Sequence, residues 1–459
     1  MALTQALAEF AIGLPSYSLQ EPVLARANQA LLDTLGVALA GTGEEVSKLA
    51  RRYVAGLGTV PKATVWGDGL RAAPAEAAFL NGIAAHALDF DDSMPTSRSH
   101  PSAPVLPAAF AAAELSDATG REFLAAYAMG LEITGRLGRV LGDTHYLRGW
   151  HSTATIGAFA ATAAAARLLG LEASDLCRAW GFAASMAGGL VRNFGTSTKA
   201  FHVGRAAQIG VNAALLVRDG LTADEGIFDG PGGFLAAYEA QNLEPDVAAL
   251  TAPNRTWDVL DPGIYVKRWP CCYATHRALG GVLQLVTERQ IRTDQIAAVT
   301  VGFPPGSDAA LIKHLPTTPT EAKFSIEYVL AVGLLDRRVG IASFDAAGLR
   351  RSDVREIMPR IRRVNLTGAG VFSGLVGFTD ITLELQGGGE IQTRVDRTPG
   401  SPVWPPSEAE SSDKFRDCAA RGIDVGQVER LWEVASRCAT LPNVGALGAA
   451  LAHRSPVTN

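Results

Sequence analysis

Alanine-rich segments with helical spacing fill most of the first 261 residues and limit the folds open to this chain. Apolar residues recur at helical intervals in these segments, and glycine or proline separates one segment from the next. Helices are predicted over residues 21–39, 120–140, 152–169, 173–187 and 204–218. Because small side chains let neighbouring helices approach closely, we expect a tightly packed helical domain.

The pattern changes after the Asp-Pro-Gly at residues 261–263. Residues 297–303 alternate as a strand does, and two alternating runs, 380–385 and 390–395, are joined by three glycines, which is typical of a hairpin. Helical spacing occurs at 278–289 and 325–335 and returns at 414–421, 425–437 and 444–453. We therefore predict a mainly α fold: a large helical domain (residues 1–265 and 404–459) with a smaller, inserted α+β lid domain (266–403).

Charge and cysteine content narrow the class of protein. Only 19% of residues are charged, the net charge is −5, and the five cysteines include no C-x-x-C pair. The acidic balance argues against a nucleic-acid partner, and the cysteines indicate neither a metal cage nor a redox motif. We expect a small-molecule partner, a reducing cytoplasm and, because so few residues are charged, an oligomer.

No segment is predicted to cross a membrane. The longest apolar stretch, 154–171, consists mostly of alanine and glycine and contains Arg167, so a buried helix in a bundle is the better interpretation. Residues 1–14 contain Glu9 and no basic residue, which is unlike a secretory signal.

Residues 81–93, Asn-Gly-Ile-Ala-Ala-His-Ala-Leu-Asp-Phe-Asp-Asp-Ser, form the most informative pattern for function. An apolar helical spacing leads into three carboxylates, so His86 and Asp89 are predicted about one turn apart near a helix C-terminus. The helix dipole disfavours carboxylates at that end, which indicates a use other than stability. The alternative interpretation is a solvated acidic loop.

Two segments bring basic groups to predicted helix starts. His151 directly precedes a predicted helix, where either anion binding or simple capping explains it. Lys199, His202 and Arg205 recur at intervals of three and would share one helical face. That face is either a carboxylate-binding surface or a solvated basic surface.

Two further segments belong to the predicted lid. Residues 266–276 lie at the domain junction, where ligand clefts often form, and contain Lys267 and the adjacent Cys271 and Cys272. The thiols are either reactive groups or small buried apolar side chains. Tyr328, near the start of a predicted helix, is either a hydrogen-bond donor to a ligand or a core aromatic.

Together these segments supply carboxylate, imidazole, ammonium, guanidinium and phenol groups, whereas the sequence has no metal-ligand spacing, P-loop or G-x-G-x-x-G turn after a strand. Such a set suits proton removal next to a carboxylate, in which a base takes the proton while cations stabilise an enolate-like transition state. Lyases, decarboxylases and epimerases of small polycarboxylates can use this chemistry.

Four of these motifs resemble the MmgE/PrpD family. They are Asn-Gly and His-Ala-Leu-Asp-Phe-Asp-Asp-Ser within 81–93, His-Pro-Ser at 100–102, Lys and His-Val-Gly within 199–204, and Lys-Arg-Trp-Pro at 267–270. The family includes 2-methylcitrate dehydratases, cis-aconitate decarboxylases and iminodisuccinate epimerases. The resemblance implies a helical domain with a smaller α+β lid, a homodimer, and no metal or organic cofactor.

The resemblance also implies which residues line the cleft between helical domain and lid. The predicted catalytic residues are Asp89, His100, His151, Lys199 and Tyr328, and the predicted substrate-binding residues are Ser93, His202, Lys267 and Cys272. His100 or Asp89 is expected to be the base and His151 the acid. We expect a cofactor-independent lyase acting on a small di- or tricarboxylate; the alternatives are a dicarboxylate epimerase and a non-catalytic carboxylate-binding homodimer.

Overall fold

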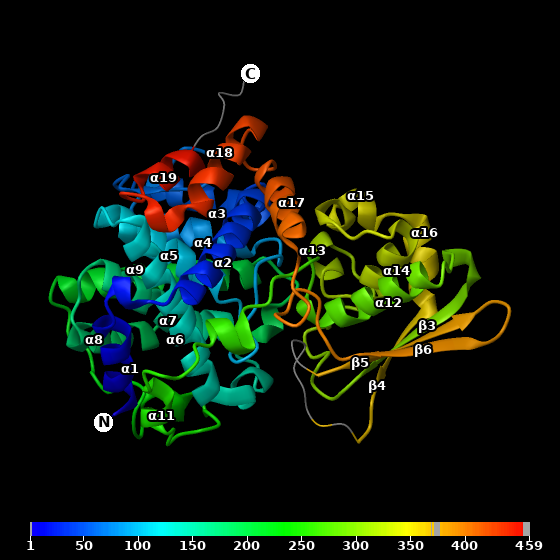
Figure 1. Cartoon of the computed structure of the whole chain (residues 1–459), viewed down its shortest axis with the longest axis horizontal. Coiled ribbons are helices and arrows are strands. Elements are labelled where there is room, and N and C mark those ends of the chain that lie inside the picture. The colour runs from blue at the N-terminus through cyan, green and yellow to red at the C-terminus, as the bar shows by residue number, and fades with distance from the viewer. Residues whose placement is uncertain (1, 369, 371–376, 453–459) are drawn as a thin grey trace.

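The computed structural model describes residues 2–368, 370 and 377–452, which form a larger helical lobe and a smaller mixed lobe (Figure 1). The end of the predicted C-terminal helical segment, residues 453–459, lies outside the described residues. The prediction of a mainly α fold with a smaller α+β part is confirmed. The exact domain boundaries at 265 and 403 stay predictions.

The larger lobe contains helices from both ends of the chain. From the N-terminal part these are α1 (Leu3–Gly13), α2 (Glu21–Gly41), α3 (Glu45–Leu57), α4 (Pro74–His86), α5 (Ser102–Leu115), α6 (Gly120–Leu147), α7 (Ser152–Leu168), α8 (Ala173–Ala184), α9 (Thr198–Arg218), α10 (Phe234–Ala237) and α11 (Val247–Thr251), with a short hairpin of β1 (Ala63–Thr64) and β2 (Arg71–Ala72). The C-terminal helices α17 (Glu408–Ala419), α18 (Val425–Ser436) and α19 (Gly445–Leu451) complete it (Figure 1). Because α17 and α18 pack on α2, one core extends through both ends of the chain.

The smaller lobe is a four-stranded sheet with helices packed against it. The strands β3 (Ile296–Phe303), β4 (Ile361–Asn365), β5 (Thr379–Leu385) and β6 (Glu390–Val395) lie in the order β4-β3-β5-β6, with only the β3–β4 pair parallel. Its helices are α12 (His276–Glu288), α13 (Pro319–Ala322), α14 (Ile326–Asp336), α15 (Ala346–Leu349) and α16 (Ser352–Ile357). Leu279, Val299 and Leu330 belong to its separate apolar core.

Two glycines allow helices α4 and α9 to pack closely against each other. A Cβ atom added to Gly82 would lie 2.9 Å from Gly204 Cα, and one added to Gly204 would lie 2.4 Å from the Phe79 carbonyl oxygen. Gly204 was predicted to begin a helix, but α9 already begins at Thr198. The glycine allows close packing instead, and Lys199 and His202 consequently lie in the first turns of α9.

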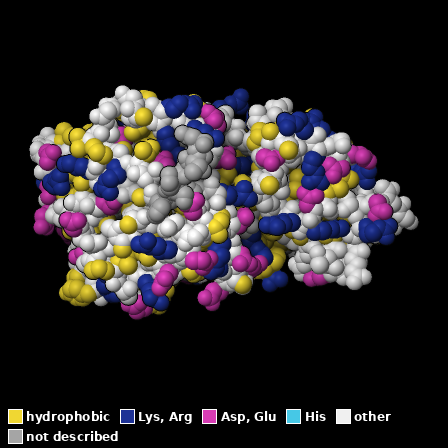
Figure 2. Space-filling view, turned by 90° about the horizontal axis from the view of Figure 1, so that it is seen from above, with side chains coloured by type: hydrophobic (Ala, Val, Ile, Leu, Met, Phe, Trp, Pro, Cys, Tyr) yellow, Lys and Arg dark blue, Asp and Glu magenta, His cyan; other side chains and the backbone are white. Residues whose placement is uncertain are grey.

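Basic and acidic side chains are intermixed on the face shown in Figure 2. Within the described residues, no helix combines the length and apolar character that a membrane crossing requires.

Candidate active site

Asp89 lies in a tight turn directly after α4. The helix ends at His86, and the Asp89 amide donates a hydrogen bond of 3.0 Å to the His86 carbonyl. Asp89 has φ of +53°, in the left-handed region, which aspartate tolerates better than most residues with a side chain. The turn directs the Asp89 carboxylate towards α9, where Lys199 lies 2.6 Å away.

A second lysine reaches Asp89 from the segment that joins the two lobes. Ser93 and Tyr265 exchange backbone hydrogen bonds of 2.9 and 2.8 Å, which places the following Lys267 beside the acidic turn. Lys267 Nζ donates to the Asp89 carbonyl oxygen at 2.6 Å and lies 3.1 Å from Asp89 Oδ1. Lys414, on α17, donates to the Phe90 and Lys267 carbonyl oxygens, both at 2.9 Å, and fastens this crossing.

The charges of this group depend on one another. Burial alone would raise the pKa of Asp89, but the Lys199 and Lys267 ammonium groups hold it well below its ordinary value. Burial alone would lower the pKa of Lys267, but the Asp89 and Asp91 carboxylates raise it. Asp89 is therefore anionic and Lys267 cationic at neutral pH.

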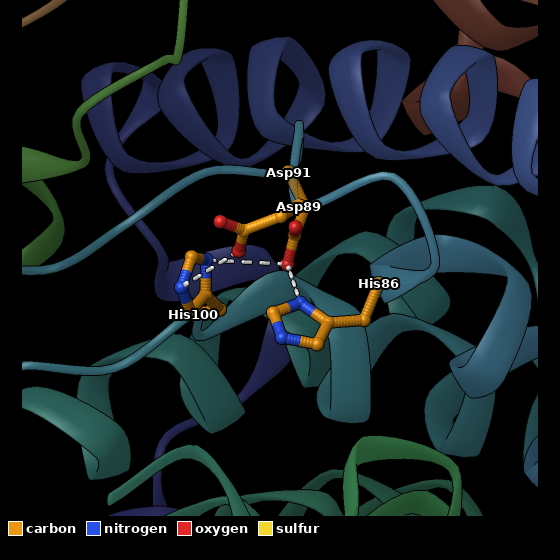
Figure 3. A group of neighbouring side chains, drawn as sticks. All are labelled: His86, Asp89, Asp91 and His100. Carbon is orange, nitrogen blue, oxygen red and sulfur yellow. Dashed lines mark hydrogen bonds and ion pairs between the residues drawn. The ribbon is translucent and has the colours of Figure 1, made fainter. Parts of the chain in front are cut away.

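Asp91 lies between two imidazoles (Figure 3). Its Oδ2 atom is 2.8 Å from His86 Nδ1 and 3.3 Å from His100 Nδ1. On the other side of the His86 ring, Nε2 accepts a hydrogen bond of 2.7 Å from Lys199 Nζ. The proton of the His86 imidazole must therefore be on Nδ1. Burial lowers the pKa of His86 to about 3, which fixes this neutral form.

The two ring nitrogens of His100 have different environments. Its Nδ1 atom is 2.8 Å from the Asp92 carbonyl oxygen, which can only accept, so Nδ1 carries the proton. Nε2 then has a free lone pair 3.7 Å from Asp89 Oδ1. Burial lowers the pKa of His100, so this nitrogen is available as a base at neutral pH. An imidazolium formed on His100 would be stabilised by Asp89 and Asp91.

The Asp92 carboxyl group contacts the start of α5. The Ser102 hydroxyl donates to this carboxyl group and the Ser102 amide donates to Oδ1 at 3.2 Å, at the start of α5. Burial raises the pKa of Asp92 to about 8, so this carboxyl group is largely protonated at neutral pH. Since Asp89, Asp91 and Asp92 are all buried, the solvated acidic loop is excluded.

His151 and His202 form a second pair of imidazoles. Their Nδ1 atoms are 3.1 Å apart, so one ring donates and the other accepts. Burial and the Lys199 ammonium group lower the pKa of both, which keeps them neutral. His151 Nε2 is buried and has no hydrogen-bond partner among the described residues.

These groups border a cavity between the lobes with about 620 Å³ of space not filled by protein atoms, part of it open to solvent. Of the predicted residues, it is lined by Asp89, Ser93, His100, His151, Lys199, Lys267 and Cys272. Lining residues that the sequence analysis missed include Arg98, Tyr146, Thr153, Phe194, Ser307 and Phe324. Their segments carry no local pattern that marks them, because only the fold brings them to one cavity. His202 contacts His151 and is not among the lining residues.

The structure does not bring Tyr328 to this cavity. Its side chain is buried in the core of the smaller lobe, and its hydroxyl donates to the Ser343 carbonyl oxygen at 2.5 Å. Burial raises the pKa of this phenol to about 12. Tyr328 is therefore a core aromatic residue of α14 whose hydroxyl group is satisfied by a hydrogen bond within the lobe.

One group of side chains has the composition of a metal site. His86, Asp89, Asp91 and His100 each offer one ligand atom, and these atoms lie within 4.8 Å of one another. However, Lys199 Nζ already contacts both His86 Nε2 and Asp89 Oδ1. A cation would have to displace this ammonium group, so the donor set fits a metal ion poorly.

Comparisons with known proteins agree with this architecture. Residues 5–245 match the MmgE/PrpD N-terminal domain, and residues 269–440 match the MmgE/PrpD C-terminal domain. Cis-aconitate decarboxylase of Homo sapiens is 30% identical, covering 99% of this chain and 95% of that protein. The proteins of the same name from Mus musculus and Aspergillus terreus are 29% and 25% identical, covering 97% and 94% of this chain and 92% and 91% of their own lengths.

These similarities extend over both lobes. They confirm the prediction of an enzyme of the lyase class. The chain belongs to the MmgE/PrpD family.

Proposed function

We propose that this enzyme is a carboxy-lyase that releases CO2 from cis-aconitate or a closely similar unsaturated tricarboxylate. The observation that carries the proposal is the convergence of Lys199, Lys267 and two neutral histidines, His100 and His151, on one cavity. Three relatives named cis-aconitate decarboxylase, each matching more than nine-tenths of the chain, support the choice of reaction.

The chemistry of this reaction needs cations and a proton donor. When the carbon–carboxylate bond breaks, its electron pair forms a new terminal double bond. The electrons of the original double bond then take up a proton at the adjacent carbon. Negative charge spreads onto the remaining carboxylates in the transition state, where Lys199 and Lys267 would stabilise it.

We assign proton delivery to His151 and a supporting role to His100. A bound polyanion raises the pKa of the imidazoles beside it, because it favours their charged form. His151 Nε2 has no hydrogen-bond partner among the described residues and is therefore free to contact a ligand. In a reaction that starts with proton removal instead, as in dehydration or epimerisation, His100 Nε2 would be the base.

The test is turnover of a panel of candidate substrates: cis-aconitate, citrate, 2-methylcitrate and iminodisuccinate. We expect CO2 release from cis-aconitate and, in proton NMR spectra, loss of its single vinyl signal with the appearance of a terminal CH2 pair. Turnover of only the hydroxy acids would replace decarboxylation by dehydration. Inversion of iminodisuccinate would establish the epimerase. Thermal stabilisation by all four without turnover would establish the non-catalytic alternative.

Lys267→Ala tests the assigned site, with exposed Lys48→Ala as the matched control. Loss of a charge that stabilises the transition state typically lowers kcat by about 10²–10³-fold. Lys48→Ala is expected to keep full activity. Equal activity of the two variants would contradict the assignment of Lys267.

We also propose that the enzyme is a homodimer. Val46, Leu49, Tyr53, Phe79 and Phe201 border an apolar groove on α3, α4 and α9. Leu49, Tyr53 and Phe201 are 48%, 63% and 45% exposed, and burial of such a patch favours self-association. Sedimentation at micromolar concentration should give a dimer, and Tyr53→Glu should shift it to a monomer.

We further propose a cytoplasmic location. All five cysteines are free and buried, as expected for a protein that folds in a reducing compartment. Fractionation of the source cells with an antibody to the chain tests this location.

A further inference from the structure

Arg98 is held in the wall of the cavity by the turn that precedes His100. Met94 and Ser99 pair through backbone hydrogen bonds of 2.9 and 3.4 Å, and Arg98 lies within this turn with φ of +47°. The turn packs closely on α6, since a Cβ atom added to Gly138 would lie 2.5 Å from Ser97 Cα. Arg98 is therefore fixed by the fold, and its side chain is only 5% exposed.

The guanidinium group of Arg98 is not satisfied by the protein. Arg98 Nε lies 2.7 Å from Asp143 Oδ1, yet none of its three guanidinium nitrogens has hydrogen-bond geometry to a described residue. The ring of Tyr146 lies below it, 5.6 Å from centroid to Cζ. A buried guanidinium group whose two outer nitrogens have no acceptor is costly, so this arrangement needs a reason beyond stability.

Stability through Asp143 is a weak reason. The Asp143 side chain is 56% exposed, and an ion pair to such a carboxylate contributes little. It also does not require the rest of the guanidinium group to be buried. The two outer nitrogens, Nη1 and Nη2, remain free to hold a carboxylate in a two-pronged pair of hydrogen bonds.

We propose that Arg98 binds one carboxylate of the substrate and so forms a second anion subsite, separate from the pair of lysines at Asp89. This inference rests on the proposed function, because it concerns the same cavity. Arg98, Lys199 and Lys267 are cationic and Asp89 is anionic, so the lining carries an excess of positive charge for a di- or trianion. Arg98 thereby sets the requirement for a further carboxylate beyond the one that reacts.

The experiment measures binding by calorimetry, without turnover. The probes are the saturated tricarboxylate tricarballylate and the two dicarboxylates obtained by omitting one carboxylate, glutarate and methylsuccinate. Arg98→Gln should weaken tricarballylate binding by about tenfold or more, the usual effect of losing hydrogen bonds to a charged group. Binding of the dicarboxylate that lacks the matching carboxylate should change by less than about threefold, because Arg98 has no partner on it.

Two further variants separate ligand binding from a structural role. Arg98→Lys keeps the charge but not the paired geometry and should fall between wild type and Arg98→Gln. Asp143→Asn removes the ion pair to Nε and should leave tricarballylate affinity within about threefold of wild type. If Asp143→Asn weakens binding as much as Arg98→Gln, Arg98 acts only by holding the turn, and the proposal is overturned.

The outcome is distinguishable from failure of the proposed reaction. Arg98-dependent binding without CO2 release would sustain the subsite and reject decarboxylation. CO2 release from cis-aconitate with unchanged tricarballylate affinity in Arg98→Gln would support decarboxylation and overturn the subsite. Equal weakening of all three probes, or no binding to the wild-type enzyme, would also overturn the subsite.

Discussion

The Nδ1 atoms of His151 and His202 face each other at 3.1 Å, although His151 lies in the turn before α7 and His202 lies on α9. If His202 donates, His151 Nδ1 accepts and its proton is on Nε2, the nitrogen at the cavity. In that arrangement the pairing with His202 places the proton of His151 on the nitrogen that delivers it. His202 is a positioning residue in this arrangement.

His202→Ala should lower kcat by about five- to tenfold with little change in KM, since about one neutral hydrogen bond is lost. The pH profile of kcat should shift as well, because His202 adds to burial and to the Lys199 ammonium group in lowering the pKa of His151. His202→Gln, whose amide both donates and accepts, should recover part of kcat. Leu216→Ala, at an exposed position on the same helix, is the control. An unchanged profile in His202→Ala would refute the positioning role.

Asp89→Asn should damage both stability and turnover. Asp89 is the shared carboxylate of two buried lysines, and removing one partner of a buried ion pair typically costs about 3–5 kcal/mol. Turnover should fall by about 10²–10³-fold, because Lys199 and Lys267 lose the carboxylate that holds them where they stabilise the transition state. Urea unfolding and initial rates measure the two effects.

The pH dependence provides a check on Asp89→Asn. The pKa of Asp89 is lowered in the folded state, so its contribution is present above the ordinary value of 3.8 and is lost as pH falls through the folded value. The difference in unfolding free energy between wild type and variant should hence be constant from pH 8 to about 5. Asp353→Asn, at an exposed ion pair, should show no measurable difference. A wild-type-like Asp89→Asn would be incompatible with this account.

Most of the fold follows from local patterns in the sequence. Alanine-rich periodicity gave the long helices, and the glycines at 387–389 gave the β5–β6 hairpin. Strand β4 was not predicted, because it is a short edge strand in which only Ile361 is fully buried and arginines follow. Gly204 was misinterpreted as a boundary because the sequence cannot show that another helix crosses there.

The candidate site was predictable where a local motif carries it and not elsewhere. The acidic turn, His151, Lys199 and Lys267 stand in unusual local patterns, and the fold brings them together. Arg98 stands in no such pattern and depends on the turn around it. Tyr328 lies in the core of the smaller lobe and not at the cavity, and helical spacing alone does not distinguish a core aromatic from one that faces a cleft.

Gly82→Ala should weaken the contact between α4 and α9. The added methyl group would lie 2.9 Å from Gly204 Cα, and backbone cannot yield as a side chain does. Overpacking of this kind costs about 1–3 kcal/mol, and kcat should fall too because the two helices carry His86 and Lys199. Gly13→Ala, at the end of α1 with no heavy atom within 4 Å of the new methyl group, should be neutral or slightly stabilising. Thermal unfolding that ranks the two variants equally would refute the close-packing argument.

Asp92→Asn should remove a specific loss of stability that occurs as pH rises towards 8. Burial raises the pKa of Asp92 from 3.8 to about 8, so the folded state holds this proton more tightly than the unfolded chain does. Stability is then lost progressively from about pH 4 to pH 8 and levels off above pH 8, and about 1 kcal/mol of this loss falls between pH 7 and pH 9. The buried histidines do not interfere, since their lowered pKa values place their titration below pH 6.5. Urea unfolding at pH 7, 8 and 9 should show the wild type losing this stability relative to Asp92→Asn, whereas parallel curves for the two proteins would mean that Asp92 does not carry the proton.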